Sequence, residues 1–417
     1  MSDVSKIFVD INIDGTDYFV GTMWYTIRVN RSFSSFQYSA EWQANPEAFP
    51  IDPVISPLHS KEVFHSGNKA LFGCFEDAAP DRWGRILMNR TFIDEARAQG
   101  KHPRSLTDID FLLMVDDISR MGALRFRISN EYLALPTTNS IPPMIRLREL
   151  LEASEKAEDS PQARKLLLAP GSSLGGARPK ATISSPDMAL NIAKFESSKD
   201  EYDVVRWEAV ALHLASECGL YVPDFKIEEI SISKKDQRTV LIEKRFDRAG
   251  TFRIPYISTM TLLNASDNDS ENYSYLHISE KLSEISSHPT EDLKELWKRM
   301  VLGILISNTD NHLRNHGLTH TPAGWRLSPL FDINPNPDNR NFSLNIDLEG
   351  NNDIKTAIEV AEYFEISINT AKKIIKSTAN TLQTWKHAAH KYRCTKSEIT
   401  RMEPAFEHPE QEIALSF

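Results

Sequence analysis

Hydrophobic and polar positions alternate along the first part of the chain. Ile7, Val9 and Ile11 share one face of an extended segment, and Asp14-Gly15 follows as a two-residue turn before Tyr18–Val20. Because alternation on both sides of such a turn is typical of two paired strands, the pattern predicts a β-hairpin. Further strands are expected at Tyr25–Asn30 and Phe36–Tyr38.

A helical pattern follows, opened by Pro80. Trp83, Ile86 and Leu87 recur at helical spacing, and proline is favoured in the first turn of a helix. The charged residues of this segment are interpreted as an ion-paired helix start; they are Asp81, Arg82 and Arg85. The polar, proline-containing stretch 136–143 then predicts a linker.

Strand and helix patterns alternate after the linker, and helices predominate towards the end. A helical pattern over Arg146–Leu168 leads into the expected strands Ala181–Ile183, Leu190–Phe195 and Val240–Lys244, with a helix at Val204–Leu220. Later helices are expected at Tyr275–Ile285, Thr290–Ser307, Ala357–Phe364, Asn369–Thr381, Trp385–Tyr392 and Ser397–Phe406. This order predicts an α+β fold.

Composition excludes several classes of protein. With 417 residues, two or three domains are expected, and 41% hydrophobic and 25% charged residues are typical of a soluble globular protein. A net charge of −10 leaves no overall basic surface for nucleic acid or anionic membrane. Cys74, Cys218 and Cys394 are widely spaced, which predicts a reducing compartment. No run has membrane-spanning length, so a cytoplasmic protein is expected.

Three oxygen-bearing side chains follow the apolar run Val301–Ile306. Asp310 comes first, Asn315 lies five residues further on, and Asp332 follows Leu330-Phe331. A carboxylate to hold the attacking hydroxyl, with an amide and a second carboxylate to hold Mg²⁺, is the set that phosphoryl transfer needs. Protein kinases carry these residue types in the same order. The stretch is therefore interpreted as a kinase catalytic centre.

Two alternatives remain for this stretch. Asp and Asn often only cap helices and turns, and an Asp with an Asn five residues on is a weak pattern by itself. The other alternative is a zinc site, with His312, His316 and His320 as ligands. Gly317 and the absence of a glutamate beside His312 argue against zinc, so magnesium is favoured.

Phosphate-binding parts are expected upstream. The segment 171–183 contains three glycines and two serines, and backbone N–H groups of such a loop can approach phosphate oxygens, with Lys180 adding charge. Lys194 shares a strand face with Leu190 and Ile192, where a lysine is costly unless it meets a fixed anion such as phosphate. The alternatives are a surface hairpin for the loop and a Lys194 that reaches solvent.

Two further positions complete a nucleotide site in this interpretation. Glu208 lies near the start of the helix after Lys194 and is the candidate to brace that lysine, with a solvent-facing glutamate as an equal alternative. The strand ending at Lys244 leads into R-F-D-R at 245–248. A kinase places the backbone groups that read adenine at such a crossover.

Five sequence blocks, taken together, resemble the HipA family of serine/threonine kinases. They are F-E-D-A-A-P-D-R-W-G-R at 75–85, S-S-L-G-G-A-R-P-K at 172–180, R-F-D-R at 245–248, N-T-D-N-H-L-R-N-H at 308–316 and L-S-P-L-F-D-I-N-P at 327–335. The resemblance implies a bilobal, protein-kinase-like fold with a β-rich N-terminal lobe, an extra N-terminal subdomain and an all-helical C-terminal lobe. The implied divisions are 1–140 for the extra subdomain, 141–248 for the nucleotide-binding part and 249–417 for the helical lobe.

The resemblance also implies roles for single residues. Asp310 looks like the catalytic base, and Asn315 and Asp332 look like Mg²⁺ ligands. The implied ATP-binding residues are Lys180, Lys194, Gly175, Gly176, Ala177, Lys244 and Phe246. Ser173 falls where such kinases phosphorylate their own loop and become inactive, although Ser172 stays open as the site. The family often has Asp where this chain has Asn311, and Glu where it has Lys244.

Substrates and partners follow from the same resemblance. Family substrates are protein serines or threonines, in the best-known members on an aminoacyl-tRNA synthetase, and their phosphorylation leads to growth arrest and persistence. The usual partner is a small DNA-binding antitoxin, HipB, so contact with DNA is expected only through the antitoxin. No membrane association is expected.

Two other function classes stay open. A small-molecule kinase would share the Asp–Asn–Asp set, but it would not explain the block at 75–85 or a serine inside the glycine-rich loop. A DNA-binding regulator is suggested by helix-turn-helix spacing at 357–375, with Ala361, Ile366 and Ile374-Ile375 as packing positions. Ordinary helix packing is the favoured alternative for that stretch, because the chain is acidic.

Overall fold

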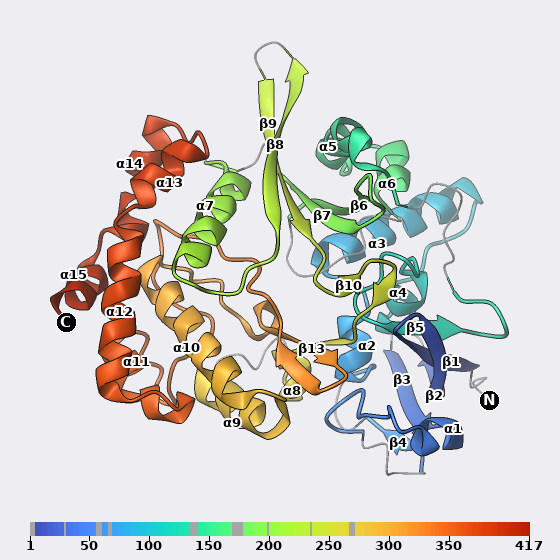
Figure 1. The fold of residues 1–417 in the computed structure, drawn as a ribbon. Coiled ribbons are helices and arrows are strands. Elements are labelled where there is room, and N and C mark those ends of the chain that lie inside the picture. Colours follow the sequence, from blue (N-terminus) through green and yellow to red (C-terminus); the bar gives the residue numbers. More distant parts are fainter. Residues whose placement is uncertain are drawn as a thin grey trace. The chain divides into compact units, whose positions relative to one another are not determined.

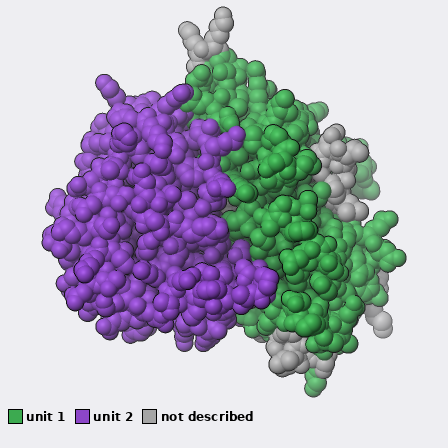
Figure 2. Space-filling view, in the orientation of Figure 1, with its two compact units in different colours: residues 1–198, 228–257 green, residues 199–227, 258–417 purple. Residues whose placement is uncertain are grey.

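A computed structural model gives the protein as two compact units, coloured separately in Figure 2. Unit 1 comprises residues 1–198 and 228–257, and unit 2 comprises residues 199–227 and 258–417. The structure describes residues 5–28, 31–55, 61–65, 69–133, 141–168, 178–197, 200–233, 236–266 and 272–417. The fold contains both helices and sheets, as predicted, while the division into three parts stays a prediction.

An antiparallel sheet with strand order β4-β3-β2-β1-β5 begins unit 1 (Figure 1). Its strands are β1 (Ser5–Ile13), β2 (Thr16–Arg28), β3 (Arg31–Tyr38), β4 (Val63–Phe64) and β5 (Leu124–Arg127). The predicted hairpin is confirmed: Ile13 pairs with Thr16, and Asp14 and Gly15 between them have φ of 48° and 83°. Two positive φ angles are what the favoured type I′ hairpin turn requires.

The helices of unit 1 are α1 (Ala40–Ala44), α2 (Gly73–Asp77), α3 (Arg82–Ala98), α4 (Asp108–Met114), α5 (Leu147–Lys156) and α6 (Pro161–Leu168). Asp81 is the N-cap of α3, and its Oδ1 accepts a hydrogen bond from Gly84 N at 2.9 Å. Such a cap satisfies a backbone donor that has no partner inside the helix. Arg85 pairs with Asp108 at 2.6 Å. These contacts agree with the predicted ion-paired helix start.

A second sheet has the order β6-β7-β9-β8, with β6 (Lys180–Ser184), β7 (Leu190–Phe195), β8 (Phe225–Ser233) and β9 (Asp236–Lys244). One face carries Ala181, Ala193 and Ile242, which pack into a buried cluster with residues of α3, α5 and α6, among them Leu87, Leu150 and Leu167. Lys180 and Lys194 therefore lie on the opposite face, because side chains alternate along a strand. The predicted pairing of Leu190–Phe195 with Ala181–Ile183 is confirmed. Short strands follow, β10 (Arg248–Ala249), β11 (Phe252–Arg253) and β12 (Tyr256–Ser258).

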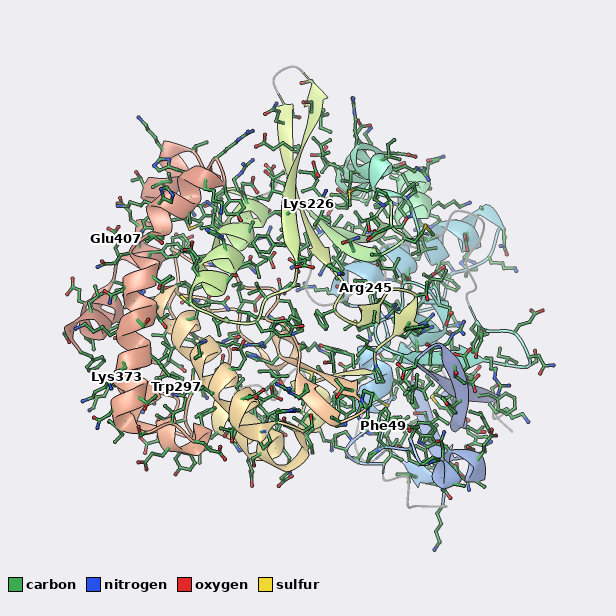
Figure 3. The ribbon with its side chains drawn as sticks, viewed as in Figure 1. Phe49, Lys226, Arg245, Trp297, Lys373 and Glu407 are labelled. Carbon is green, nitrogen blue, oxygen red and sulfur yellow. The ribbon has the colours of Figure 1, made fainter. Side chains whose placement is uncertain are left out.

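Unit 2 is mainly helical. Its helices are α7 (Val204–Glu217), α8 (Thr259–Leu262), α9 (Tyr275–Ile285), α10 (Pro289–Leu305), α11 (Ile354–Glu359), α12 (Ile368–Leu382), α13 (Trp385–Lys391), α14 (Lys396–Phe406) and α15 (Pro409–Ser416). Trp297 on α10, labelled in Figure 3, is buried and donates from Nε1 to Ala357 O at 2.9 Å. One hairpin was not expected in this helical part, β13 (Gly317–Thr321) with β14 (Gly324–Leu327).

In the ranges that the structure describes, no helix combines the length and the apolar character needed to cross a membrane.

Candidate active site

The loop that follows α10 is held in place on several sides. Ser307 has a positive φ of 54°, which turns the chain sharply at the helix end. Its Oγ donates to Ala405 O at 3.2 Å, and Asn308 N donates to Gly303 O at 2.9 Å. The apolar run before this turn is buried, as the sequence predicted. The turn therefore sets the position of the polar loop that begins at Asn308 in unit 2.

Asp310 points outward from a backbone whose neighbouring residues are buried. Its side chain is 69% exposed, whereas Thr309 and Asn311 are 7% and 5% exposed. Thr309 O accepts hydrogen bonds from the backbone N and the Oγ of Ser343, at 3.0 and 3.1 Å. On the other side, Asn311 Nδ2 donates to the Tyr275 hydroxyl. The position of the carboxylate is thus set by buried contacts before and after it.

Asn315 lies at the end of the short 3-10 turn η3 (Leu313–Asn315) and is 3% exposed. Its Nδ2 donates to Asp310 O at 2.6 Å, so the two predicted site residues are in direct contact. Its Oδ1 is buried and has no hydrogen-bond partner. The Oγ1 of Thr259 donates to Leu313 O at 2.6 Å and fixes the turn from α8.

His316 follows Asn315 and supports the loop from inside. The ring is 1% exposed and packs edge-on against Tyr275, with ring centroids 5.3 Å apart. Burial, and then the nearby Arg299 charge, lower the pKa of His316 to about 3. The ring is therefore neutral at physiological pH and acts as an apolar support.

Asp332 lies in a second loop that runs beside the first. It is half-buried and has a positive φ of 56°, a backbone conformation that non-glycine residues rarely adopt and that is common at functional sites. Asn334 N donates to Asn308 Oδ1 at 3.1 Å, and Asn336 N donates to Ser307 O at 3.2 Å. The structure thus brings the loops of Asp310, Asn315 and Asp332 together in unit 2.

The donor set of these loops fits a hard cation. A buried amide oxygen without a partner, on Asn315, accompanies the carboxylate of Asp332, and Mg²⁺ prefers oxygen ligands of these kinds. No group of three or more His, Cys, Asp or Glu able to hold a metal occurs among the described residues. An Mg²⁺ site with two protein ligands does not need such a group, because substrate phosphates and water complete the coordination.

The three candidate zinc ligands have separate surroundings. His312 Nδ1 accepts a hydrogen bond from Arg314 N at 3.2 Å, and His316 is buried against Tyr275. His320 packs against Trp325, with ring centroids 5.0 Å apart. Within the described part of the chain these contacts give the zinc alternative no support.

Unit 1 holds the predicted phosphate-binding lysines. Lys180 and Lys194 are directly opposite each other on β6 and β7. Two like charges in that position destabilise a sheet unless they are compensated. Lys180 Nζ lies 3.1 Å from Asp81 Oδ2, and Lys194 Nζ lies 2.9 Å from Glu243 Oε1. Each ammonium group thus has a carboxylate partner on this face of the sheet.

Glu243 is a contact that the sequence analysis did not identify. Lys194 pairs with Leu241 and Glu243 pairs with Ile192, so Lys194 and Glu243 are diagonal neighbours on one face. The predicted brace, Glu208, is buried in α7, which belongs to unit 2. Its pairing with Lys194 stays a prediction, and so does the joining of the two sets of residues into one ATP site.

Part of the predicted nucleotide site lies outside the described residues. This part comprises Ser172, Ser173, Gly175, Gly176 and Ala177. Lys244 is exposed at the end of β9. The ring centroids of Phe246 and Tyr256 are 5.9 Å apart. Adenine binding at these two positions remains a prediction.

The R-F-D-R block has a structural role that the sequence analysis missed. Arg245 and Asp247 are 2% and 0% exposed and form a two-point ion pair, with distances of 2.8 and 2.6 Å. Arg245, labelled in Figure 3, also donates to Ser119 O at 2.6 Å, and Asp247 accepts from Gly122 N at 2.8 Å. The block therefore ties the end of β9 to the loop 116–122. The sequence signal is that charged residues follow directly after the apolar run Val240–Ile242.

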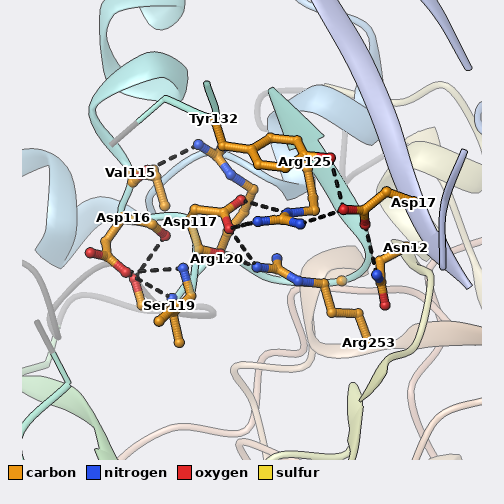
Figure 4. A network of polar contacts seen from close by, with 12 residues as sticks. Asn12, Asp17, Val115, Asp116, Asp117, Ser119, Arg120, Arg125, Tyr132 and Arg253 are labelled. Carbon is orange, nitrogen blue, oxygen red and sulfur yellow. Dashed lines mark hydrogen bonds and ion pairs between the residues drawn. The ribbon is translucent and has the colours of Figure 1, made fainter. Parts of the chain in front are cut away.

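Further ion pairs continue from this loop (Figure 4). Asp117 Oδ2 lies 2.6 Å from Arg125 and 2.9 Å from Arg253. Arg125 also pairs with Asp17 at 2.7 Å. This network joins β2, β5 and β11 to the loop after α4, all within unit 1.

The stretch 357–375 folds as α11, a 3-10 turn η4 (Ala361–Phe364) and the first half of α12. Ala361, Ile366 and Ile375 are buried, and Ile374 is half-buried. These positions pack inside unit 2, as the helix-packing interpretation predicts. Lys373 lies on the outer side of α12 (Figure 3).

Comparison with known proteins yields a family and a fold. The profile of the HipA-like C-terminal domain matches residues 172–385. No curated protein sequence matches the chain. The structure of HipA of Shewanella oneidensis MR-1, from a toxin–antitoxin complex with HipB and operator DNA, superposes with a TM-score of 0.63 at 14% identity, covering 98% of this chain and 96% of that one.

A second solved structure is less similar. The proinflammatory kinase CtkA of Helicobacter pylori superposes with a TM-score of 0.38 at 13% identity, covering 58% of this chain and 92% of that one. A value this low does not establish a shared fold. The first superposition does, and it confirms the predicted fold class.

Proposed function

The chain belongs to the HipA-like C-terminal domain family, and on this premise we propose that it is an ATP- and Mg²⁺-dependent protein serine/threonine kinase, the toxin of a toxin–antitoxin pair. The observation that carries the proposal is the placement of Asp310. An exposed carboxylate on a backbone held by buried contacts on both sides is suited to orient a hydroxyl of a second molecule.

Each proposed role follows from the chemistry of the side chain. Asp310 accepts the proton of the substrate hydroxyl. The hydroxyl oxygen forms a bond to the γ-phosphorus of ATP while the bond from that phosphorus to the departing ADP oxygen breaks. Asn315 and Asp332 hold Mg²⁺, which neutralises phosphate charge when bound. Lys180 and Lys194 hold phosphate oxygens. Glu243, whose carboxylate contacts Lys194 in the structure, orients that lysine, and Glu208 is proposed as its second brace. Lys244 and Phe246 contact adenine through the main chain.

Regulation is proposed to act through the glycine-rich loop. Gly175, Gly176 and Ala177 cover the phosphates in the active form. Phosphorylation of Ser173, or of its neighbour Ser172, adds negative charge to the loop. This charge repels the phosphates of ATP, so the phosphorylated loop cannot cover them and the enzyme is inactive.

Partners are proposed from the family and from the relative described above. The complex of Shewanella HipA contains HipB and operator DNA, which supports a HipB-like antitoxin for this chain and contact with DNA through it. The proposed substrate is a serine or threonine on a translation protein such as an aminoacyl-tRNA synthetase, and the proposed compartment is the cytoplasm.

Incubation with ATP and Mg²⁺ followed by intact-mass spectrometry tests the proposal. Wild-type protein should gain one phosphate at Ser173, and Asp310→Asn should reduce the rate by roughly 10²–10⁴-fold, as expected when a positioned proton acceptor is lost. Asp338→Asn, another exposed carboxylate of unit 2, serves as the matched control and should leave the rate unchanged. A wild-type protein that never gains phosphate under any metal condition contradicts the proposal. ATP consumption with a small molecule and no phosphoprotein would favour the small-molecule kinase.

A further inference from the structure

Among the residues of unit 2 that the structure describes, two buried amide oxygens have no hydrogen-bond partner, and only one of them has been given a role. They are Oδ1 of Asn315 and Oδ1 of Asn334. Nearly all buried polar atoms in folded proteins are paired, so an unpaired one calls for an explanation such as a bound ion or water. The proposed Mg²⁺ explains Asn315. Asn334 lies two residues after Asp332 and belongs to no role described so far.

The orientation of both amides is determined by their neighbours. Asn315 Nδ2 donates to Asp310 O at 2.6 Å, and Asn334 Nδ2 donates to Asp332 Oδ1 at 3.3 Å. Exchanging nitrogen and oxygen in either side chain would place two acceptor oxygens against each other. The unpaired atom is therefore the oxygen in both cases.

Asn334 is also held firmly beside the catalytic loop. Its backbone N donates to Asn308 Oδ1 at 3.1 Å, two residues before Asp310. Asn336, on the same loop, donates from Nδ2 to Thr309 Oγ1 at 3.0 Å. The free oxygen of Asn334 is thus presented by a loop that is anchored to the same segment as Asp310.

The chemistry of this oxygen selects its partner. An amide oxygen only accepts, so it can bind a hydrogen-bond donor or a cation but no phosphate oxygen. The adjacent Asp332 carboxylate favours a cation, and Mg²⁺ and Mn²⁺ take carboxylate, amide and water oxygens together.

We propose that Asn334 supplies a third protein oxygen to the divalent cation held by Asn315 and Asp332. The inference rests on the proposed function, because that function requires the cation. Three protein oxygens leave the remaining positions of an octahedral ion to phosphate and water.

Mn²⁺ is the probe for the test, and its free concentration is followed by electron paramagnetic resonance with the full-length protein and ADP. Asn334→Ala should weaken Mn²⁺ binding at least roughly tenfold, in line with the loss of a supporting metal-site group. Asn334→Asp should bind Mn²⁺ as tightly as wild type or more tightly, because the cation relieves the repulsion between two adjacent carboxylates.

Asn334→Ala and Asn336→Ala together separate a ligand from a structural side chain. If Asn334 only donates its Nδ2 hydrogen to Asp332, Asn334→Ala should weaken Mn²⁺ binding no more than Asn336→Ala does. Asn336→Ala is the matched control, since it loosens the same loop and removes no unpaired oxygen. Its Mn²⁺ affinity should fall by less than that of Asn334→Ala, because no oxygen proposed to bind the cation is removed.

The outcomes distinguish this inference from the proposed function. Wild-type protein that binds Mn²⁺ with ADP, together with an Asn334→Ala variant of equal affinity, overturns the role of Asn334 and leaves the kinase proposal intact. Wild-type protein that binds no Mn²⁺ overturns both. Should Asn334→Ala fail to fold, as judged by its thermal unfolding, a weakened Asn334→Asp variant that is still folded would by itself contradict the inference.

Discussion

Single residues of the loop 307–316 have buried partners beside the exposed Asp310. The amide of Asn311 is 5% exposed and bonded to the hydroxyl of Tyr275. An aspartate there would have to bury a charge, which is costly without a paired cation. The neutral amide avoids this cost and still connects the loop to α9. Tyr275 is thus a positioning residue for Asp310.

Tyr275→Phe should lower the phosphorylation rate roughly tenfold, as expected when about 1.4 kcal/mol of transition-state stabilisation is lost. The variant leaves the Asn311 amide buried without its partner, which should also lower the free energy of unfolding by about 1–3 kcal/mol. Mn²⁺ affinity should be unchanged, because no ligand is altered. Phosphorylation kinetics, urea unfolding and Mn²⁺ titration measure the three quantities. Tyr273→Phe, a half-buried neighbour, is the control; an equal loss in both variants would contradict the positioning role.

At the scale of elements, the loop 307–316 lies between the end of α10 and the hairpin β13–β14. Gln411 on α15 donates to Leu305 O at 3.0 Å, so the C-terminal helices satisfy a carbonyl at the end of α10. On the other side, Ser328 N, just after β14, donates to Gly317 O at 2.8 Å and closes the hairpin. His320 lies in β13 against Trp325 of β14. Burial lowers the pKa of His320 to about 4 from an ordinary value of 6.5.

His320 should make unit 2 sensitive to acid. Between pH 6.5 and 4 the unfolded state takes up a proton at His320 that the folded state does not. The free energy of unfolding therefore falls as the pH falls, by at most about 1.4 kcal/mol per pH unit. The fall is smaller than this limit because the ring is partly exposed. His320→Phe keeps a ring against Trp325 and should flatten this dependence. Urea unfolding at several pH values measures it. The exposed His390, changed to Phe, is the control; an unchanged pH dependence in His320→Phe would contradict the prediction.

At the scale of the whole molecule, unit 1 depends on buried charges for its internal connections. Asp247 is 0% exposed and lies 2.6 Å from both Arg245 and Arg248. Burial alone would raise the pKa of Asp247, but the charges of these two arginines and the hydrogen bonds from Arg245 and Gly122 lower it far below its ordinary range. The carboxylate therefore stays charged, and the end of β9 is joined to the N-terminal part of unit 1.

Asp247→Asn should destabilise unit 1 by about 3–5 kcal/mol, because it leaves buried arginine charges without their counter-ion. Hydrogen exchange should then increase in unit 1 more than in unit 2. Asp236→Asn breaks an ion pair of similar length with Arg238, but that aspartate side chain is 41% exposed. This control should change the free energy of unfolding by no more than about 1 kcal/mol. An equal loss of unfolding free energy in the two variants would contradict the prediction that burial of the ion pair causes the larger effect of Asp247→Asn.

Local pattern explains which elements could be predicted. Tyr275–Ile285 was expected as a helix with the bounds of α9, and the hairpin at Asp14-Gly15 was expected from its turn residues. In both cases neighbouring residues supply the signal. The strand expected at Phe36–Tyr38 is part of the longer β3. Of the strand expected at Tyr25–Asn30, residues 25–28 belong to β2, and residues 29–30 lie outside the described part of the chain. The hairpin β13–β14 and α15 were missed, because each is short and bordered by polar residues.

By itself the sequence determined the residue types and order of the loop 307–316, the pairing of the lysine-bearing strands and the family, because motifs and alternation are properties of neighbouring positions. Only the tertiary structure decided that Glu243 accompanies Lys194, that the R-F-D-R block is an internal tie, and that the oxygen of Asn334 is left unpaired. The physical reason is that the energy of a charge or a polar atom depends on burial and on partners far away in the chain.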